Sequence, residues 1–228
     1  MPEPMIITID GPAGSGKSTA ARLLAQRLGF EFLDTGAMYR AVTLAALRFQ
    51  SELHDQTALS RLLDTLQIEL PRDRVVLNGE DVTSLIRTPE ITAASGPIAS
   101  SPVVRQRLVE WQRKIAAGRN MVCEGRDQGT IVFPEAQCKF FLVADAAERA
   151  RRRQRELQAR GEPANFEDVL AAQQARDARD ATRAVGPMTP AADAVLLDST
   201  SLSIEDMVTR MEQAIRRHAL APASDNQK

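Results

Sequence analysis

The side chains best suited to chemistry lie in a glycine-rich run near the start of the chain, GPAGSGKS at residues 11–18. The run matches a pattern of one glycine, four residues, a second glycine, a lysine and a serine. Glycines let successive backbone N–H groups turn toward an anion, Lys17 supplies a mobile positive charge, and the Ser18 hydroxyl is a suitable ligand for Mg²⁺. The spacing therefore predicts a loop that binds the phosphates of a nucleoside triphosphate.

The loop is flanked by the elements that this use requires. Met5 to Ile9 has the composition of a short buried strand, and Ser18 to Leu28 has apolar residues at helical spacing. A helix that begins at the loop directs the positive end of its dipole toward the phosphates. We expect Lys17 to be catalytic and Ser18 to hold Mg²⁺, with ATP contacts from Gly11, Pro12, Ala13, Gly14, Ser15, Gly16, Lys17, Ser18 and Thr19.

Two further expected strand ends each carry an arginine close to a glycine. Arg40 lies in LDTGAMYR, which follows an expected strand at Phe30 to Leu33, and Arg126 lies in EGRDQGT after another. Arginine offers planar, paired donors to phosphate oxygens, so both residues are candidates for binding the phosphate of an acceptor. A local alternative stays open, in which Thr35 caps the next helix and Arg40 faces solvent.

A third group of arginines lies on two expected helices within residues 146–183, separated by Gly161 and Pro163 and with a helix cap at Asn165. Such a charge run can be a solvated helix face. Phosphoryl transfer, however, spreads negative charge over oxygens from which water must be kept away. We therefore interpret the two helices as a lid that brings Arg149 to the nucleotide, with catalytic roles for Arg153, Arg179 and Arg183.

Short apolar runs alternate with helical stretches along the chain, which predicts an α/β fold with a parallel sheet flanked by helices. The runs lie at residues 5–9, 30–33, 121–123, 140–143 and 194–197. We expect a hairpin turn at Asn78-Gly79. The expected domains are a core P-loop domain at 1–34, 119–150 and 184–220, an acceptor-side insertion at 35–118, a lid at 151–183 and a frayed tail at 221–228.

The composition limits the classes of function. The chain has 228 residues, 43% of them hydrophobic, with 29 basic and 30 acidic side chains, so it can bury a core and has no net charge that favours nucleic acid or a membrane. Cys123 and Cys138 lie in apolar runs and His54 and His218 lie far apart, which favours structural thiols and no histidine metal site. Without a secretion signal in MPEPMIITIDG, we expect a cytoplasmic monomer.

Five motifs together resemble the bacterial cytidylate kinases over residues 5–215: GPAGSGKST, LDTGAMYR, TAASGPIASSPVVR, EGRDQGTIVFP and RDARDATRA. The resemblance implies an adenylate-kinase-like fold with a monophosphate-binding insertion and a helical lid, ATP and Mg²⁺ as cofactors, and CMP and dCMP as substrates. It also implies base recognition by Ser95, Arg105 and Asp127, ribose contacts from Arg176 and Asp180, phosphate contacts from Arg40, Arg126 and Arg183, and a place for Thr35 in the acceptor site.

The hydrogen-bonding groups of cytosine suit these residues. A carboxylate or hydroxyl accepts from the cytosine amino group, whereas the O4 of uracil would face the Asp127 carboxylate, so we expect CMP and dCMP to be preferred over UMP. The acceptor phosphate is already ionised, so in-line transfer needs no protein base. Two roles stay open for Glu124, holding a magnesium-bound water or capping and pairing with arginine. The rival functions are a small P-loop kinase for a sugar, a shikimate-like acid or another monophosphate, and a nucleotide-gated regulatory protein.

Overall fold

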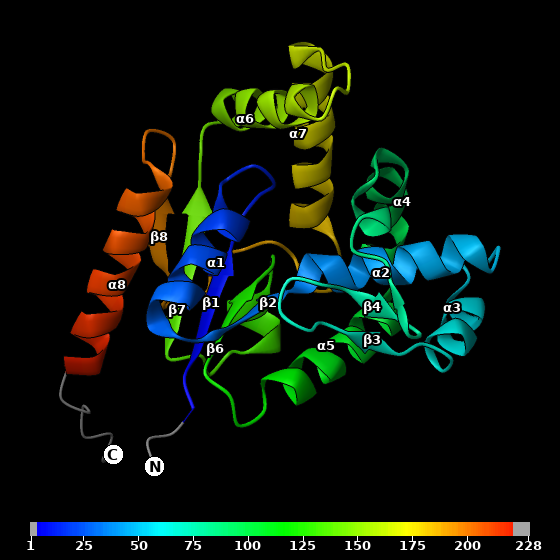
Figure 1. Ribbon diagram of the computed structural model, residues 1–228, viewed down its shortest axis with the longest axis horizontal. Helices are drawn as coiled ribbons and strands as arrows, with labels where there is room; N and C mark the ends of the chain where they lie inside the picture. The colour runs from blue at the N-terminus through cyan, green and yellow to red at the C-terminus, as the bar shows by residue number, and fades with distance from the viewer. Residues whose placement is uncertain (1–3, 221–228) are drawn as a thin grey trace.

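A five-stranded sheet forms the centre of the molecule (Figure 1). The computed structural model describes residues 4–220, so the tail expected at 221–228 lies outside the described residues. The paired strands are parallel, and their order is β2-β6-β1-β7-β8. The parallel sheet expected from the sequence is confirmed, with bounds β1 (Ile6–Asp10), β2 (Glu31–Asp34), β6 (Met121–Glu124), β7 (Cys138–Val143) and β8 (Val195–Asp198).

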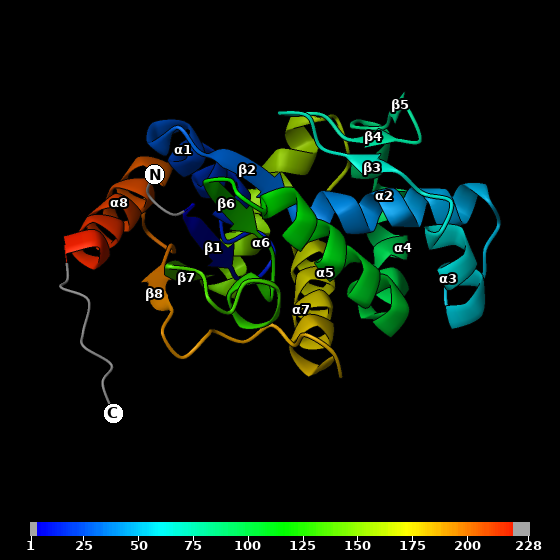
Figure 2. The ribbon, with the colours of Figure 1, turned by 90° about the horizontal axis from the view of Figure 1, so that it is seen from below.

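Helices pack against both faces of this sheet, as the two views show (Figures 1 and 2). Their bounds are α1 (Lys17–Leu28), α2 (Thr35–Arg48), α3 (Gln56–Leu63), α4 (Pro89–Ser100), α5 (Pro102–Ala116), α6 (Ala146–Ala159), α7 (Phe166–Thr182) and α8 (Ile204–Leu220). One buried cluster joins β1 and β7 to α1 and α8, and the other joins β2 and β6 to α2, α3 and α5. The sheet therefore separates two apolar cores.

The side chains of β1 explain this division. Ile7 and Ile9 are fully buried in the cluster with α1 and α8. Because side chains alternate along a strand, Thr8 and Asp10 point to the opposite face. Both are buried there although they are polar. The central strand thus carries apolar residues on one face and polar ones on the other, and the polar face is the one that α5 shares.

A small antiparallel sheet, β3 (Ile68–Glu69), β4 (Val76–Leu77) and β5 (Glu80–Asp81), lies beside α2 and α3 in Figure 1. The turn between β4 and β5 has positive φ at Asn78 (49°) and Gly79 (84°). Two such residues give the tight turn whose twist matches a hairpin. The hairpin turn expected at Asn78-Gly79 is confirmed.

Helices α6 and α7 lie beyond the carboxyl ends of the strands, at the top of Figure 1. Gly161 has φ of 74° in the turn between them, and the Asn165 side chain accepts from the Glu167 N–H at the start of α7. The two helices and the Asn165 cap expected from the sequence are therefore present. The turn directs α7 back toward the sheet, so that Arg176 and Asp180 line the same cavity as Thr35 at the start of α2.

Both cysteines are buried free thiols, as expected. Burial raises the pKa of the Cys123 thiol well above its usual range, which keeps it protonated and unreactive. Between residues 4 and 220, no helix has the length and apolar character needed to cross a membrane.

Candidate active site

The loop between β1 and α1 has the backbone that its glycine spacing predicts. Gly14 and Gly16 have φ of 76° and 83°, in the left-handed region that glycine enters without a side-chain clash. A Cβ on Gly11 would collide with the carbonyl oxygen of Leu142 in β7, so glycine is required where the chain leaves β1. The loop leads directly into α1, whose first residue is Lys17.

Lys17, Ser18 and Glu124 form a polar cluster beside the loop. Lys17 Nζ donates to the Pro12 carbonyl at 3.0 Å and lies 3.5 Å from Glu124 Oε1, while the Ser18 hydroxyl donates to Glu124 Oε2 at 2.9 Å. Burial, followed by the nearby charge of Arg126, lowers the pKa of Lys17 to about 7. One role considered for Glu124 was capping and pairing with an arginine. Among the described contacts its ion-pair partner is Lys17 instead.

A cavity of about 220 Å³ opens from this cluster. Its walls come from the phosphate loop, the ends of β2 and β6, and helices α2, α4, α5 and α7, so segments distant in sequence meet there. From the loop, Ala13, Gly14, Lys17 and Ser18 line it. Every residue expected at the acceptor lines it as well: Thr35, Arg40, Ser95, Arg105, Arg126, Asp127, Arg176, Asp180 and Arg183.

A buried ion pair forms one part of the cavity wall. The guanidinium of Arg105 donates to the Asp127 carboxylate, and the two side chains are only 2% and 4% exposed. Burial raises the pKa of Asp127, while the charges of Arg105 and Arg183 oppose that rise. Arg183 lies 3.9 Å from the second carboxylate oxygen. The result is a polar surface that offers donors and an acceptor side by side.

The remaining arginines of the cavity form a cluster of positive charge. Arg126 donates to Asp180 at 3.0 Å, and Arg40 donates to Asp34 at 3.3 Å. Burial, followed by the charge of Arg126, lowers the pKa of Arg176 to about 10. A buried cation that has another cation beside it is stabilised when an anion binds between the two. The cluster is therefore suited to phosphate groups.

The first turn of α2 departs from one expectation. The helix cap is Asp34, whose carboxylate accepts from the Ala37 N–H at 2.8 Å. Thr35 is the first helical residue, and its hydroxyl donates to the Glu124 carbonyl at 2.7 Å, which ties α2 to β6. The alternative in which Thr35 caps the helix and Arg40 faces solvent is wrong, because the Asp34 carboxylate makes the capping bond and Arg40 lines the cavity.

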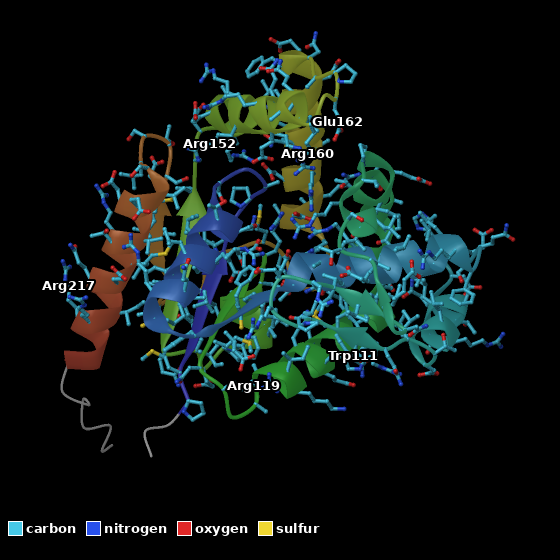
Figure 3. The ribbon with its side chains drawn as sticks, viewed as in Figure 1. Trp111, Arg119, Arg152, Arg160, Glu162 and Arg217 are labelled. Carbon is cyan, nitrogen blue, oxygen red and sulfur yellow. The ribbon has the colours of Figure 1, made fainter. Side chains whose placement is uncertain are left out.

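The lid arginines occupy different environments. Arg149 is buried and donates to the Ala13 carbonyl of the loop at 3.0 Å and to Asp177 at 2.5 Å. Arg152, labelled in Figure 3, donates to the Ser199 carbonyl at 2.6 Å. Arg153 instead pairs with Glu156 at 3.2 Å. Among the residues expected to bind or act, those outside the cavity wall are Gly11, Pro12, Ser15, Gly16, Thr19, Arg149, Arg153 and Arg179.

Two polar side chains of the cavity wall and a glycine that covers the buried ion pair were not anticipated from the sequence. Tyr39 lines the cavity, and burial raises its pKa to about 12, so its hydroxyl stays a donor. Asp34 lines it as the partner of Arg40. A Cβ on Gly186 would collide with Arg105 and Asp127, so the backbone there covers the ion pair. The Gly186-Pro187 dipeptide was a turn signal that marked this segment.

The residues of the loop fit a nucleoside triphosphate with Mg²⁺. The Ser15 hydroxyl is buried without a hydrogen-bond partner among the described residues. It lies between glycines whose positive φ lets backbone N–H groups point toward an anion. Ser18 and Glu124 place hard oxygen ligands side by side. No group of three or more His, Cys, Asp or Glu side chains in residues 4–220 is arranged to hold a metal, so phosphates and water would supply most ligands, as Mg²⁺ usually requires.

Comparisons with known proteins agree with this geometry. The model of the family described as cytidylate kinase matches residues 7–217. A cytidylate kinase of Pasteurella multocida is 46% identical over 96% of this chain and 98% of its own, and one of Carboxydothermus hydrogenoformans is 48% identical over 93% and 98%. A solved structure of an uncharacterized protein from Eubacterium ventriosum shares the fold, with a TM-score of 0.52, 13% identity, and coverage of 93% of this chain and 98% of its own. The chain therefore belongs to the cytidylate kinase family.

Proposed function

We propose that the chain transfers the γ-phosphoryl of ATP to CMP and dCMP, giving CDP and dCDP by direct in-line transfer. As a member of its family, the chain is a nucleoside monophosphate kinase, a phosphotransferase. The observation that carries the finer proposal is a single cavity with the phosphate loop in one wall and the Arg105–Asp127 pair in another. A donor triphosphate and an acceptor base can therefore occupy one continuous site.

Recognition of cytosine rests on the buried ion pair and on Ser95. The Asp127 carboxylate and the Ser95 hydroxyl accept from the exocyclic amino group, and Arg105 donates to O2 and N3. The Ser95 hydroxyl donates its hydrogen bond to the Thr92 carbonyl at 2.8 Å, so its oxygen lone pairs remain available to accept. Uracil would present O4 to the carboxylate and meet repulsion.

The positive cluster binds the rest of the acceptor. Arg40, Arg126 and Arg183 take the phosphate, and Arg176 and Asp180 take the ribose. In the structure Arg126 and Arg40 pair with Asp180 and Asp34, so an incoming phosphate exchanges one anionic partner for another instead of meeting unpaired charges. Thr35 holds the β6 end of the site in place through its bond to Glu124.

Transfer depends on positioning and electrostatics. The acceptor phosphate is ionised at neutral pH, so no protein base is needed. Lys17 stabilises the charge that develops on the transferred group, and Ser18 is the side chain that would hold Mg²⁺, which supplies neutralisation of phosphate charge when bound. Arg149 contacts the donor, while Arg153, Arg179 and Arg183 reach the transferred phosphoryl when α6 and α7 close over the site.

The domain roles follow from these assignments. Residues 1–34, 119–150 and 184–220 form the core, residues 35–118 the monophosphate-binding insertion, and residues 151–183 the lid. The enzyme acts as a cytoplasmic monomer in pyrimidine nucleotide metabolism, without nucleic-acid or membrane partners. Support for the insertion comes from Arg40, Ser95 and Arg105, which all lie in it and all line the cavity.

A coupled assay of ADP release tests the proposal. The purified chain is given ATP and Mg²⁺ with CMP, dCMP, UMP, AMP or GMP in turn. We expect kcat/KM for CMP and dCMP to exceed that for UMP by about tenfold to a hundredfold, the range of one lost base contact. Equal efficiency with UMP would contradict cytosine recognition. Turnover only with a sugar or a shikimate-like acid, or ATP binding without turnover, would contradict the proposed reaction.

A further inference from the structure

Asp10 is a buried carboxylate that the proposed reaction does not use. It ends β1, one residue before the phosphate loop, is 4% exposed, and does not line the cavity. Its Oδ1 accepts from the Gln128 N–H at 2.9 Å and its Oδ2 from the Gly129 N–H at 2.8 Å. A carboxylate in a protein core loses its hydration, so two such bonds are needed to hold it there.

These two N–H groups open a π-helical segment, Gln128–Val132, beside the cavity. The first N–H groups of a helix have no partner within it, and the residue at the N-cap commonly supplies one. The N-cap residue here is Asp127, and aspartate is among the best capping residues. Its side chain nevertheless makes no capping bond and pairs with Arg105 instead.

Asp10 therefore fills the capping position that Asp127 leaves. The Asp10 carboxylate comes from the centre of the sheet. Asp10 is aligned with Phe141 of β7, and the preceding Ile9 is aligned with Glu124 of β6. Pairing on both sides of β1 fixes the carboxylate in space. Without it, Asp127 is the N-cap residue whose carboxylate could accept from these N–H groups, and it would turn away from the cavity to do so.

We propose that Asp10 is a positioning residue for the acceptor base. By capping residues 128–132 from β1, it leaves the Asp127 carboxylate free to face the base. The inference rests on the proposed function, because it assigns to Asp127 a contact with the acceptor. Asp10 ends β1, and β1 leads into the phosphate loop. The bonds from Gln128 and Gly129 to Asp10 therefore also fix the phosphate loop relative to the acceptor side of the cavity.

Asp10→Asn tests the proposal with almost no change in shape. The amide keeps one accepting oxygen but turns an NH₂ donor toward the other N–H group. We expect kcat/KM for CMP to fall by about tenfold or more, the CMP:UMP ratio to fall by a similar factor, and KM for ATP to change by less than about twofold. An unchanged CMP:UMP ratio, or a KM for ATP that rises in parallel, would overturn the proposal.

Thr8→Val is the matched control. Thr8 lies on the same strand and the same face, and its hydroxyl is buried without a hydrogen-bond partner among the described residues. Valine has the same shape, so strand packing near Gly129 is kept. All kinetic constants should stay within about twofold of the wild type. If Thr8→Val lowers the CMP:UMP ratio as much as Asp10→Asn does, the effect belongs to packing and the proposal is wrong.

A double substitution tests whether Asp10 acts through Asp127. In an Asp127→Asn background, adding Asp10→Asn should lower the CMP:UMP ratio by less than about twofold, because the group that it positions is already altered. Full additivity of the two substitutions would overturn the proposal. A wild-type enzyme that fails to phosphorylate CMP would refute the proposed function itself, whereas an active wild type with an unaffected Asp10→Asn variant refutes this inference alone.

The wild-type protein supplies the test if Asp10→Asn does not fold. Burial raises the pKa of Asp10 to about 7 in surroundings that include Asp127, Arg126 and the Cys123 thiol. Protonation removes one of its two acceptors, so the amide-proton NMR signals of Gln128 and Gly129 should shift on acidification through about pH 7, and the CMP:UMP ratio should fall with the same midpoint. The phosphates of CMP and UMP titrate alike and cancel in the ratio. A ratio that stays constant while both amides titrate would overturn the proposal.

Discussion

The donor and acceptor walls of the cavity are built in different ways. The donor wall comes from one short run of the chain, the phosphate loop, of which Ala13, Gly14, Lys17 and Ser18 line the cavity; its proposed binding groups are backbone N–H groups and one lysine. The acceptor wall takes Arg40 from α2, Ser95 from α4, Arg105 from α5 and Asp127 from the end of β6. Phosphate can be bound by any backbone that turns its N–H groups inward, whereas a planar base needs side chains that converge from several directions.

The charges of the two walls differ as well. Lys17 on the donor wall is a buried cation whose pKa is lowered to about 7 by burial even though Glu124 lies 3.5 Å away, so a further anion beside it would stabilise its charge. On the acceptor wall, Arg105 and Asp127 already neutralise each other. The donor wall is therefore arranged to gain electrostatic stabilisation on binding, and the acceptor wall to discriminate between ligands by hydrogen-bond direction.

The largest effect should follow from removing the charge of the donor wall. We expect Lys17→Met to lower kcat by about a thousandfold, because the transition state loses a pre-positioned cation. The chain should still fold, although the substitution leaves the buried Glu124 carboxylate without its cationic partner. Single-turnover measurements with CMP and ATP would show the loss in the chemical step.

Lys139→Met is the control for this change. Lys139 is also a buried lysine, but it pairs with Asp193 at 2.9 Å and does not line the cavity. Its kcat should stay within about threefold of the wild type. Near-normal turnover of Lys17→Met, or an equal loss in Lys139→Met, would remove the distinction between the two walls.

An intermediate effect is expected from the acceptor wall. Asp127→Asn keeps an oxygen for Arg105 but offers an NH₂ donor, which suits the O4 of uracil better than the amino group of cytosine. The CMP:UMP ratio of kcat/KM should fall by about tenfold to a hundredfold, with KM for ATP unchanged. A rise in KM for ATP alongside that for CMP would mean that the two walls do not act separately.

The smallest effect is expected from the lid. Arg153 pairs with Glu156 outside the cavity, so its proposed role depends on closure of α6 and α7. We expect Arg153→Ala to lower kcat by about fivefold to tenfold. Arg160→Ala changes an exposed arginine at the C-terminal end of the same helix (Figure 3) and should have no effect. If the two variants behave alike, Arg153 is a solvated arginine of the helix face.

Much of the fold could be predicted because its signals are local. The strand at Met121 to Cys123 and the turn at Asn78-Gly79 depend on the preferences of neighbouring residues, and both were found where expected. The cap of α2 was the exception, because Asp34 and Thr35 are adjacent and both are good capping residues. Two hydrogen bonds in the folded chain distinguish them, from the Ala37 N–H to Asp34 and from the Thr35 hydroxyl to Glu124.

The sequence by itself determined the phosphate loop, since Gly14, Gly16 and Lys17 act through backbone torsions and a charge that their own neighbours position. The tertiary structure decided which arginines face the cavity: Arg126 and Arg183 line it, and Arg153 does not, although all three lie in similarly polar segments. It also decided that Asp10 caps Gln128–Val132, a contact that spans 118 positions between Asp10 and Gln128. Such contacts depend on sheet order and helix orientation, which local residue preferences do not specify.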